Sequence, residues 1–263
     1  MCTAVVAFDP LSPFPVLLAG VRDEFADRPW LPPGPHWPDR PGLIGGRDLQ
    51  AGGTWLAVDP GAPRVACVLN GHGRPAPPDG RISRGELPLR AAATGEIDDL
   101  DLTRVDPFHL VCAEPTVVRL CTWDGVELAE RKLPPGLHMI VNTGLEGRGP
   151  RGEVHPDAAA QMAARIAHFR PLLEAAPRPE PGAGTAAEAW GAWLPLVEGG
   201  GLDRGDHRAL VLSRDFGDGR LWGTSSVSLV ALAQGGVRYD FTAGPGDGNA
   251  WTTVLSSIER DGA

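Results

Sequence analysis

Aromatic residues, cysteines and long apolar runs are all scarce in this sequence. Aromatic residues account for 6% of the 263 residues, and the four cysteines are Cys2, Cys67, Cys112 and Cys121. They form no CxxC pair, so the spacing typical of a zinc site is missing and we expect no metal. No apolar stretch approaches the roughly 20 residues that a membrane-spanning helix needs. These gaps argue against zinc-finger proteins and against proteins that span a membrane.

Targeting signals and basic charge are scarce as well. No basic segment followed by an apolar run opens the sequence, so we expect no secretory signal, a cytoplasmic location and free thiols. The 24 lysines and arginines are outnumbered by 33 acidic residues, which gives a formal charge of −9. Nucleic acids and anionic membrane surfaces attract basic proteins, so neither is an expected partner. A small-molecule ligand or substrate is expected instead, and the oligomeric state is left open.

Glycine and proline, by contrast, are abundant, with 35 and 27 residues. Many lie in short clusters such as WLPPGPHWP, which mark turns between short elements. Apolar runs rich in β-branched residues between these clusters predict strands. The expected strands cover 3–8, 16–20, 64–73, 108–113, 117–123, 126–132 and 137–142, with a glycine-rich approach to a strand at 45–59 and two strands across 221–241.

Helices are expected in three places. A Ser-x-x-Glu pattern that is typical of a capping box opens the first, at 83–94. The alanine-rich segment 156–176 is the strongest helix pattern, and Pro171 is expected to kink or interrupt its last part. A short helix at 185–196 follows. Together the elements predict an α+β fold with mostly antiparallel strands, in one domain that covers residues 1–263.

Several sequence blocks resemble those of a known family. After a Met-Cys start come VRDEFADRP (21–29), GGRDLQAGGTWLAVD (45–59), VLN (68–70), SRGEL (83–87), DPFHLV (106–111), PGLHMIVN (135–142) and WGTSS (222–226). In these blocks and in their order, the chain resembles the Transport and Golgi organisation 2 family, also called the NRDE-motif family. The long GGRDLQAGGTW block is the most specific part of the resemblance.

This resemblance implies a four-layer αββα sandwich of the kind found in N-terminal-nucleophile hydrolases. In the most similar branch, a mature N-terminal cysteine attacks an amide, while other family members are implicated in haem trafficking. The chain departs from the family pattern at Val21, where the motif has asparagine, and at Ser225, where arginine is frequent. If that arginine binds a carboxylate or phosphate, this protein's ligand differs or binds more weakly.

The hydrolase interpretation assigns a role to each polar residue near the motifs. With Met1 removed, Cys2 carries a thiol and a free α-amine, which have ordinary pKa values of about 8.5 and 7.7–8.0. Arg22 would favour the thiolate, and Asp23 would orient the α-ammonium group. Asn70 and Asn142 both end predicted strands, and in the resemblance they match positions that bear on the oxyanion hole. Trp30, Trp55, His72 and Ser225 are the expected substrate contacts.

A carrier of haem or another apolar ligand is the second hypothesis. Thiolate and imidazole both ligate haem iron, and no CxxCH attachment motif is present. An apolar pocket formed by tryptophans would serve either function. The hydrolase needs no cofactor, whereas the carrier would hold haem on one of Cys2, His36, His72, His109 or His138, beside Trp30, Trp37 and Trp55.

Purely structural roles are the third hypothesis, in which the protein is an interaction module. Cys2 is then a small residue that packs at the start of the chain. Arg22, Asp23 and Glu24 would form an ion-pair cluster that holds the 25–42 loop, with Arg28 and Arg47 as further partners. In this case mutation of Cys2 leaves the function intact.

Overall fold

Two antiparallel sheets form the centre of this computed structural model, which describes residues 2–149, 154–217, 219–246 and 250–257. The first sheet contains β1 (Thr3–Phe8), β2 (Val16–Phe25), β10 (Gly136–Val141), β11 (Gly144–Leu145), β12 (Ser213–Asp215), β13 (Leu221–Ala233), β14 (Gly236–Ala243) and β15 (Thr252–Ser256). Its strand order is β11-β10-β1-β2-β13-β14-β15, and β12 pairs with the outer part of β13. The strands of the two chain ends therefore lie side by side.

The second sheet is a meander, because each strand pairs with its neighbour in the sequence. It contains β3 (Trp30–Gly34), β4 (Ile44–Asp48), β5 (Leu56–Asp59), β6 (Arg64–Asn70), β7 (Phe108–Glu114), β8 (Val117–Trp123) and β9 (Leu128–Lys132). Consecutive antiparallel pairing needs only short connections, which suits a sequence rich in turn residues.

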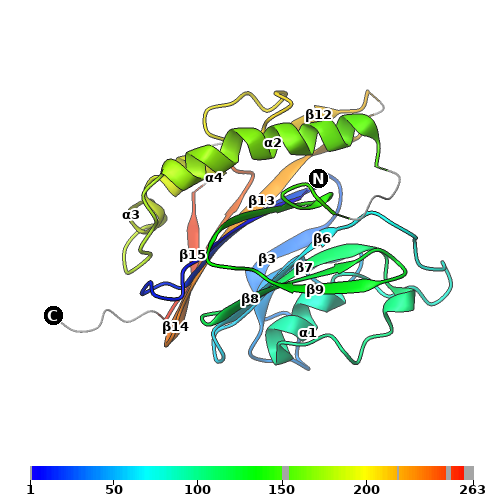
Figure 1. The fold of residues 1–263 in the computed structure, drawn as a ribbon, viewed down its shortest axis with the longest axis horizontal. Coiled ribbons are helices and arrows are strands. Elements are labelled where there is room, and N and C mark those ends of the chain that lie inside the picture. The colour runs from blue at the N-terminus through cyan, green and yellow to red at the C-terminus, as the bar shows by residue number, and fades with distance from the viewer. Residues whose placement is uncertain (1, 150–153, 218, 247–249, 258–263) are drawn as a thin grey trace.

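Opposite faces of the central strands, such as β2, enter different apolar clusters, as the twofold alternation of strand side chains requires. Leu18 on β2 packs with Leu56 on β5 in a cluster between the two sheets. Its neighbour Leu17 points the other way and packs with Phe169 and Trp190 of the helices. The helices that cover this outer face are α2 (Pro156–Ala175), α3 (Ala186–Trp190) and α4 (Trp193–Val197). Figure 1 shows α2 lying across the first sheet.

A single helix, α1 (Glu86–Thr94), covers the outer face of the second sheet (Figure 1). Its Leu87 packs with Ala66 on β6 and Leu110 on β7 in a third apolar cluster. A short 3-10 helix, Leu102–Arg104, follows before β7. The chain is thus an α+β protein with two antiparallel sheets and few helices.

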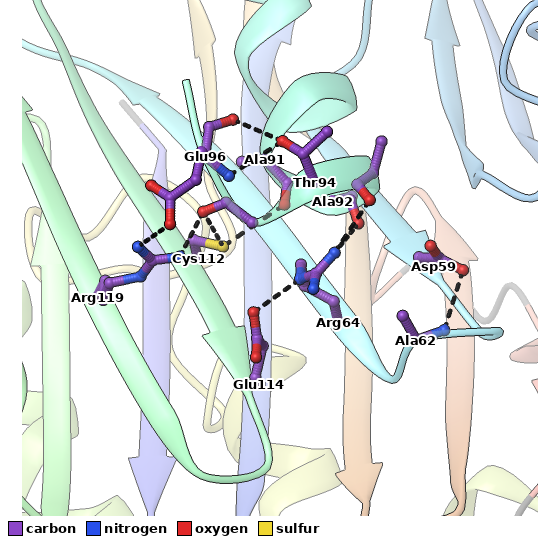
Figure 2. Close-up of polar contacts among 12 residues, drawn as sticks. Asp59, Ala62, Arg64, Ala91, Ala92, Thr94, Glu96, Cys112, Glu114 and Arg119 are labelled. Carbon is purple, nitrogen blue, oxygen red and sulfur yellow. Dashed lines mark hydrogen bonds and ion pairs between the residues drawn. The ribbon is translucent and has the colours of Figure 1, made fainter. Parts of the chain in front are cut away.

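Arginines from the sheet hold the end of α1 in place (Figure 2). Arg64 Nη1 donates to the carbonyl of Ala92 at 2.9 Å, and its Nε donates to Glu114 Oε1 at 2.9 Å. Arg119 donates to the carbonyl of Gly95 and, at 2.8 Å, to Glu96 Oε1. Carbonyls at a helix C-terminus lack intrahelical partners and carry partial negative charge, so cationic donors stabilise this end.

Most of the predicted strands and the helix at 156–176 are confirmed, with ends that differ by a few residues. The predicted capping box is wrong: the helix begins at Glu86, and no side chain caps it. Instead, Ser83 Oγ accepts a hydrogen bond from Gly85 N at 3.1 Å, and Glu86 binds Arg90. Helix α2 continues through Pro171. The strand β3 lies in the segment expected to be a proline-rich loop.

Candidate active site

Cys2 lines a cavity of about 550 Å³ at one end of the two sheets. The thiol precedes β1 directly, and its Sγ donates to the carbonyl of Asp23 at 3.8 Å. Polar residues dominate the wall, and they come from β2 and the turn after it, the end of β4 and the β4–β5 loop, β6, and the segments before α1 and β7. The wall is formed by Cys2, Arg22, Asp23, Glu24, Phe25, Arg28, Asp48, Ala51, Thr54, Trp55, Val68, Asn70, Arg81, Ile82, Ser83, Arg84 and Asp106.

Cys2 differs from the other three cysteines because it is partly exposed, whereas they are buried. Burial of its sulfur raises the pKa of the Cys2 thiol, and the nearby charge of Arg22 lowers it by a smaller amount. Burial also raises the pKa of Cys67 to about 12 and that of Cys112 to about 11. At neutral pH the Cys2 thiol is therefore protonated, and its use as a nucleophile requires a base.

Arg22 is held in a fixed orientation beside Cys2. Its guanidinium lies 4.5 Å from the centre of the Trp55 ring, and Nη1 donates to Ser225 Oγ at 2.8 Å. Ser225 Oγ in turn donates to the carbonyl of Arg22 at 3.2 Å. Two carboxylates lie further away, Glu24 at 3.8 Å and Asp48 at 3.9 Å. Ser225 thus positions Arg22 and is not part of the cavity wall.

Asp23 is buried and is oriented by two residues that received no role from the sequence, Arg165 and Thr224 of the WGTSS block. Thr224 Oγ1 donates to Asp23 Oδ1 at 2.7 Å, and Arg165 Nη1 lies 3.6 Å from Asp23 Oδ2. The side chains of Asp23 and Arg165 are both fully buried. A β-bulge between Thr224 and Ser226 lets Thr224 reach Asp23 while Ser225 reaches Arg22.

A signal for Arg165 was present in the sequence. On helix α2 it follows Met162 by three residues and precedes Phe169 by four, so all three lie on one face. Met162 and Phe169 are fully buried. An arginine on a buried stripe needs a buried anionic partner, and Asp23 is that partner.

Asn70 and Asn142 are brought together, but only Asn70 lines the cavity. Asn142 Nδ2 donates to the backbone carbonyl of Asn70 at 2.8 Å and so fixes the end of β6. The Asn142 side chain is buried, whereas Asn70 is exposed. The Asn70 amide has no hydrogen-bond partner among the described residues and can donate into the cavity.

Glycines allow the cavity rim to form. A Cβ on Gly53 would lie 2.4 Å from the backbone of Gly85, so these two loops approach at backbone contact distance. The approach is completed by a hydrogen bond from Thr54 N to the carbonyl of Gly85 at 3.0 Å. Similarly, a Cβ on Gly46 would lie 2.2 Å from the Trp55 ring that stacks on Arg22. The GGRDLQAGGTW and SRGEL blocks are therefore two halves of one rim.

Other predicted site residues lie outside the cavity wall. Trp30 contacts Trp55 edge to face, with ring centres 5.7 Å apart, and so supports the wall from behind. His72 does not line the cavity, and burial lowers the pKa of its imidazole. Val21 packs in the cluster under the helices, so its departure from the family motif does not alter the cavity.

The remaining histidines considered for haem are also elsewhere. His36 and His138 each bond to a nearby backbone carbonyl, of Pro32 and Pro134 respectively. His109 is buried between Thr122 Oγ1 at 3.0 Å and the carbonyl of Asn142 at 3.2 Å. Trp37 is buried and donates to the carbonyl of Gly52. None of these residues forms part of the cavity wall.

Comparison with known protein families assigns the chain to a family. The sequence profile described as Transport and Golgi organisation 2 matches residues 1–168, which is more than half of the chain. The chain belongs to the Transport and Golgi organisation 2 family. A comparison with curated proteins returned no match. The matched range includes Cys2, Asp23, Asn70 and Arg165, whereas Thr224 lies beyond it.

Two negative findings concern the described part of this family member. In that part no group of three or more histidine, cysteine, aspartate or glutamate side chains is placed to hold a metal ion. No helix among the same residues is both long enough and apolar enough to cross a membrane.

Proposed function

We propose that this protein is a cysteine-nucleophile amide hydrolase or acyl transferase that acts on a small, partly apolar molecule. The observation that carries the proposal is the position of Cys2, partly exposed in a polar cavity beside Arg22, Asp23 and Asn70. We also propose that the two sheets and their covering helices form the αββα sandwich of N-terminal-nucleophile hydrolases. The three apolar clusters, one between the sheets and one under each outer set of helices, support this assignment.

Because the pKa of the Cys2 thiol is raised, the reaction needs a base that takes the thiol proton. No histidine lines the cavity, and the Asp23 carboxylate is engaged by Thr224 and Arg165. Removal of Met1, which lies outside the described residues, would provide the α-amine of Cys2 as the base. Its ordinary pKa of about 7.7–8.0 leaves part of the amine neutral at physiological pH.

The reaction then has two stages. In the first, the Cys2 Sγ bonds to the carbonyl carbon while the α-amine takes the thiol proton. The C–N bond breaks, the leaving nitrogen receives that proton, and a thioester remains on Cys2. In the second, water or another acceptor attacks the thioester, and the thiol regains a proton. The Asn70 amide would stabilise the oxyanion, a contribution of roughly 3 kcal/mol for one such donor.

Hydrolysis of small N-acyl p-nitroanilides tests this proposal. We expect turnover by the wild-type protein, at least a thousandfold loss in Cys2→Ser, and roughly a hundredfold loss of kcat in Asn70→Ala. Cys121→Ala is the matched control, because that thiol is buried and lies outside the cavity, and it should keep full activity. Equal rates for Cys2→Ser and wild type would refute the nucleophile.

The haem-carrier alternative is tested separately by titration with haemin in the visible range. None of the candidate histidines lines the cavity, so only the Cys2 thiolate could ligate iron there. A saturable band that Cys2→Ser abolishes, together with no anilide turnover, would favour the carrier over the hydrolase.

A further inference from the structure

We propose that the substrate carries a single carboxylate group and that Arg84 binds it. Arg84 lines the same cavity as Cys2, in the segment that leads into α1. The inference rests on the proposed function for the reaction at Cys2, whereas binding of the carboxylate is tested independently of turnover.

Arg84 differs from the other arginines of the cavity wall in its partners. Arg28 Nε lies 2.7 Å from Asp48 Oδ2, and Arg81 Nη1 lies 3.3 Å from Asp106 Oδ2. Arg22 is near Glu24 and Asp48, as described above. Arg84, by contrast, donates from Nη1 to the carbonyl of Pro107 at 3.1 Å, and no carboxylate of the described residues lies within 4.0 Å of it.

The free donors of Arg84 have the geometry of a carboxylate site. Its Nε and Nη2 have no acceptor among the described residues, and neither atom is sealed from solvent. The planar guanidinium presents such a pair of donors in the fork arrangement that matches two carboxylate oxygens. The anchors of this segment, Ser83 Oγ on Gly85 N and Thr54 N on the Gly85 carbonyl, hold the fork in place.

The electrostatics of the cavity favour one negative charge on the ligand. Burial lowers the pKa of Arg84, which means that its charge is partly desolvated without a full counter-charge. The Cys2 thiol is neutral at physiological pH, so it supplies no anion in the resting protein. With the buried pair of Asp23 and Arg165 set aside as neutral, the side chains of the wall include four guanidinium groups and three carboxylates: Arg22, Arg28, Arg81 and Arg84 against Glu24, Asp48 and Asp106. A monoanion such as a carboxylate balances this surplus, and a phosphate dianion exceeds it.

Calorimetric titration with matched probes tests the inference. The probes are N-hexanoylglycine, its neutral carboxamide, and N-hexanoyl-aminoethyl phosphate, and the protein is the full chain with Cys2→Ala, which prevents turnover. We expect the carboxylate to bind about tenfold or more tightly than the carboxamide. In the Cys2→Ala background, Arg84→Gln should abolish this preference, and Arg84→Lys should retain only part of it.

Arg131→Gln is the control, since Arg131 lies on the exposed strand β9 and the substitution removes the same charge away from the cavity. It should leave the preference intact, and thermal melting of each variant checks that it folds. Equal binding of acid and carboxamide, no binding of either, a preference that survives Arg84→Gln, or tighter binding of the phosphate would overturn the inference. Carboxylate binding through Arg84 in a protein without turnover would refute the proposed function and leave this inference standing. Turnover of neutral anilides without the preference for the carboxylate would overturn this inference and leave the proposed function standing.

Discussion

At the scale of single residues, environment separates Cys2 from the other thiols. Cys67 and Cys121 are buried, and burial raises the pKa of each to about 12. We predict that a small alkylating reagent such as iodoacetamide at about pH 8 modifies Cys2 first, because Cys2 alone among the four is partly exposed. Peptide mass mapping over time measures this order. Simultaneous modification of Cys67 or Cys121 in the folded protein would contradict it.

The buried pair of Asp23 and Arg165 is the second prediction at this scale. Arg165→Met removes a buried guanidinium that lies 3.6 Å from the Asp23 carboxylate, so we expect the free energy of unfolding to fall by about 3–5 kcal/mol. In the double variant with Asp23→Asn, part of that loss should be recovered, because the buried carboxylate charge is removed together with the guanidinium. Urea denaturation of the four proteins gives the coupling energy. Additive effects would show that the two side chains do not interact.

At the scale of elements, the sequence predicted strands and helices better than it predicted their ends. The pattern of short apolar runs rich in β-branched residues identified β1, β7 and β8. It missed β3, whose prolines and glycine are typical of a loop. The capping-box pattern failed because Glu86 Oε1 accepts from Arg40 and from Arg90 Nε, so it does not fold back on the helix start. These partners come from tertiary structure, which local patterns cannot reveal.

The contact between the two rim loops depends on the absence of side chains. We predict that Gly53→Ala destabilises the protein by roughly 1–3 kcal/mol, since the new Cβ would lie 2.4 Å from the Gly85 backbone. Thermal or urea unfolding measures the loss. Gly235→Ala is the matched control, because a Cβ there meets nothing within 4 Å. Equal stability of the two variants would contradict the proposed packing of the rim.

His109 links β7 to β8 through Thr122 and gives the fold a pH dependence. Burial lowers the pKa of His109 to about 4, against about 6.5 in the unfolded chain. Between these values the unfolded state binds more protons, so His109 contributes stability that is fully present above about pH 6.5 and lost as the pH falls towards 4. The loss attributable to this residue is about 3 kcal/mol.

Substitution of the same residue tests this dependence. His109→Gln, which does not titrate, should flatten the stability profile between pH 6.5 and 4, as measured by urea unfolding at several pH values. His207→Gln, at a side chain that is 73% exposed, should leave the slope unchanged. An unaltered slope in His109→Gln would disprove the assignment.

At the scale of the whole molecule, the cavity joins segments that are far apart in the sequence. The motifs indicated Cys2, Arg22, Asp23 and Asn70, and the fold brings all four to one cavity wall. Arg165, and Thr224 within the WGTSS block, received no role from the sequence, because their roles depend on how α2 and β13 pack against β2. His72 was predicted to contact the substrate because it lies two residues after Asn70 in the sequence. The chain turns after β6, so His72 does not line the cavity. The motif blocks therefore predicted the polar residues of the cavity wall, whereas the residues that orient Asp23 depend on tertiary packing.

The most direct test of the central claim is the mass of the N-terminal peptide after incubation with a p-nitrophenyl acyl ester. The account predicts a chain that begins at Cys2 and carries one acyl group on that residue, with no acylation in Cys2→Ser. Retention of Met1 together with an unmodified Cys2 would contradict it.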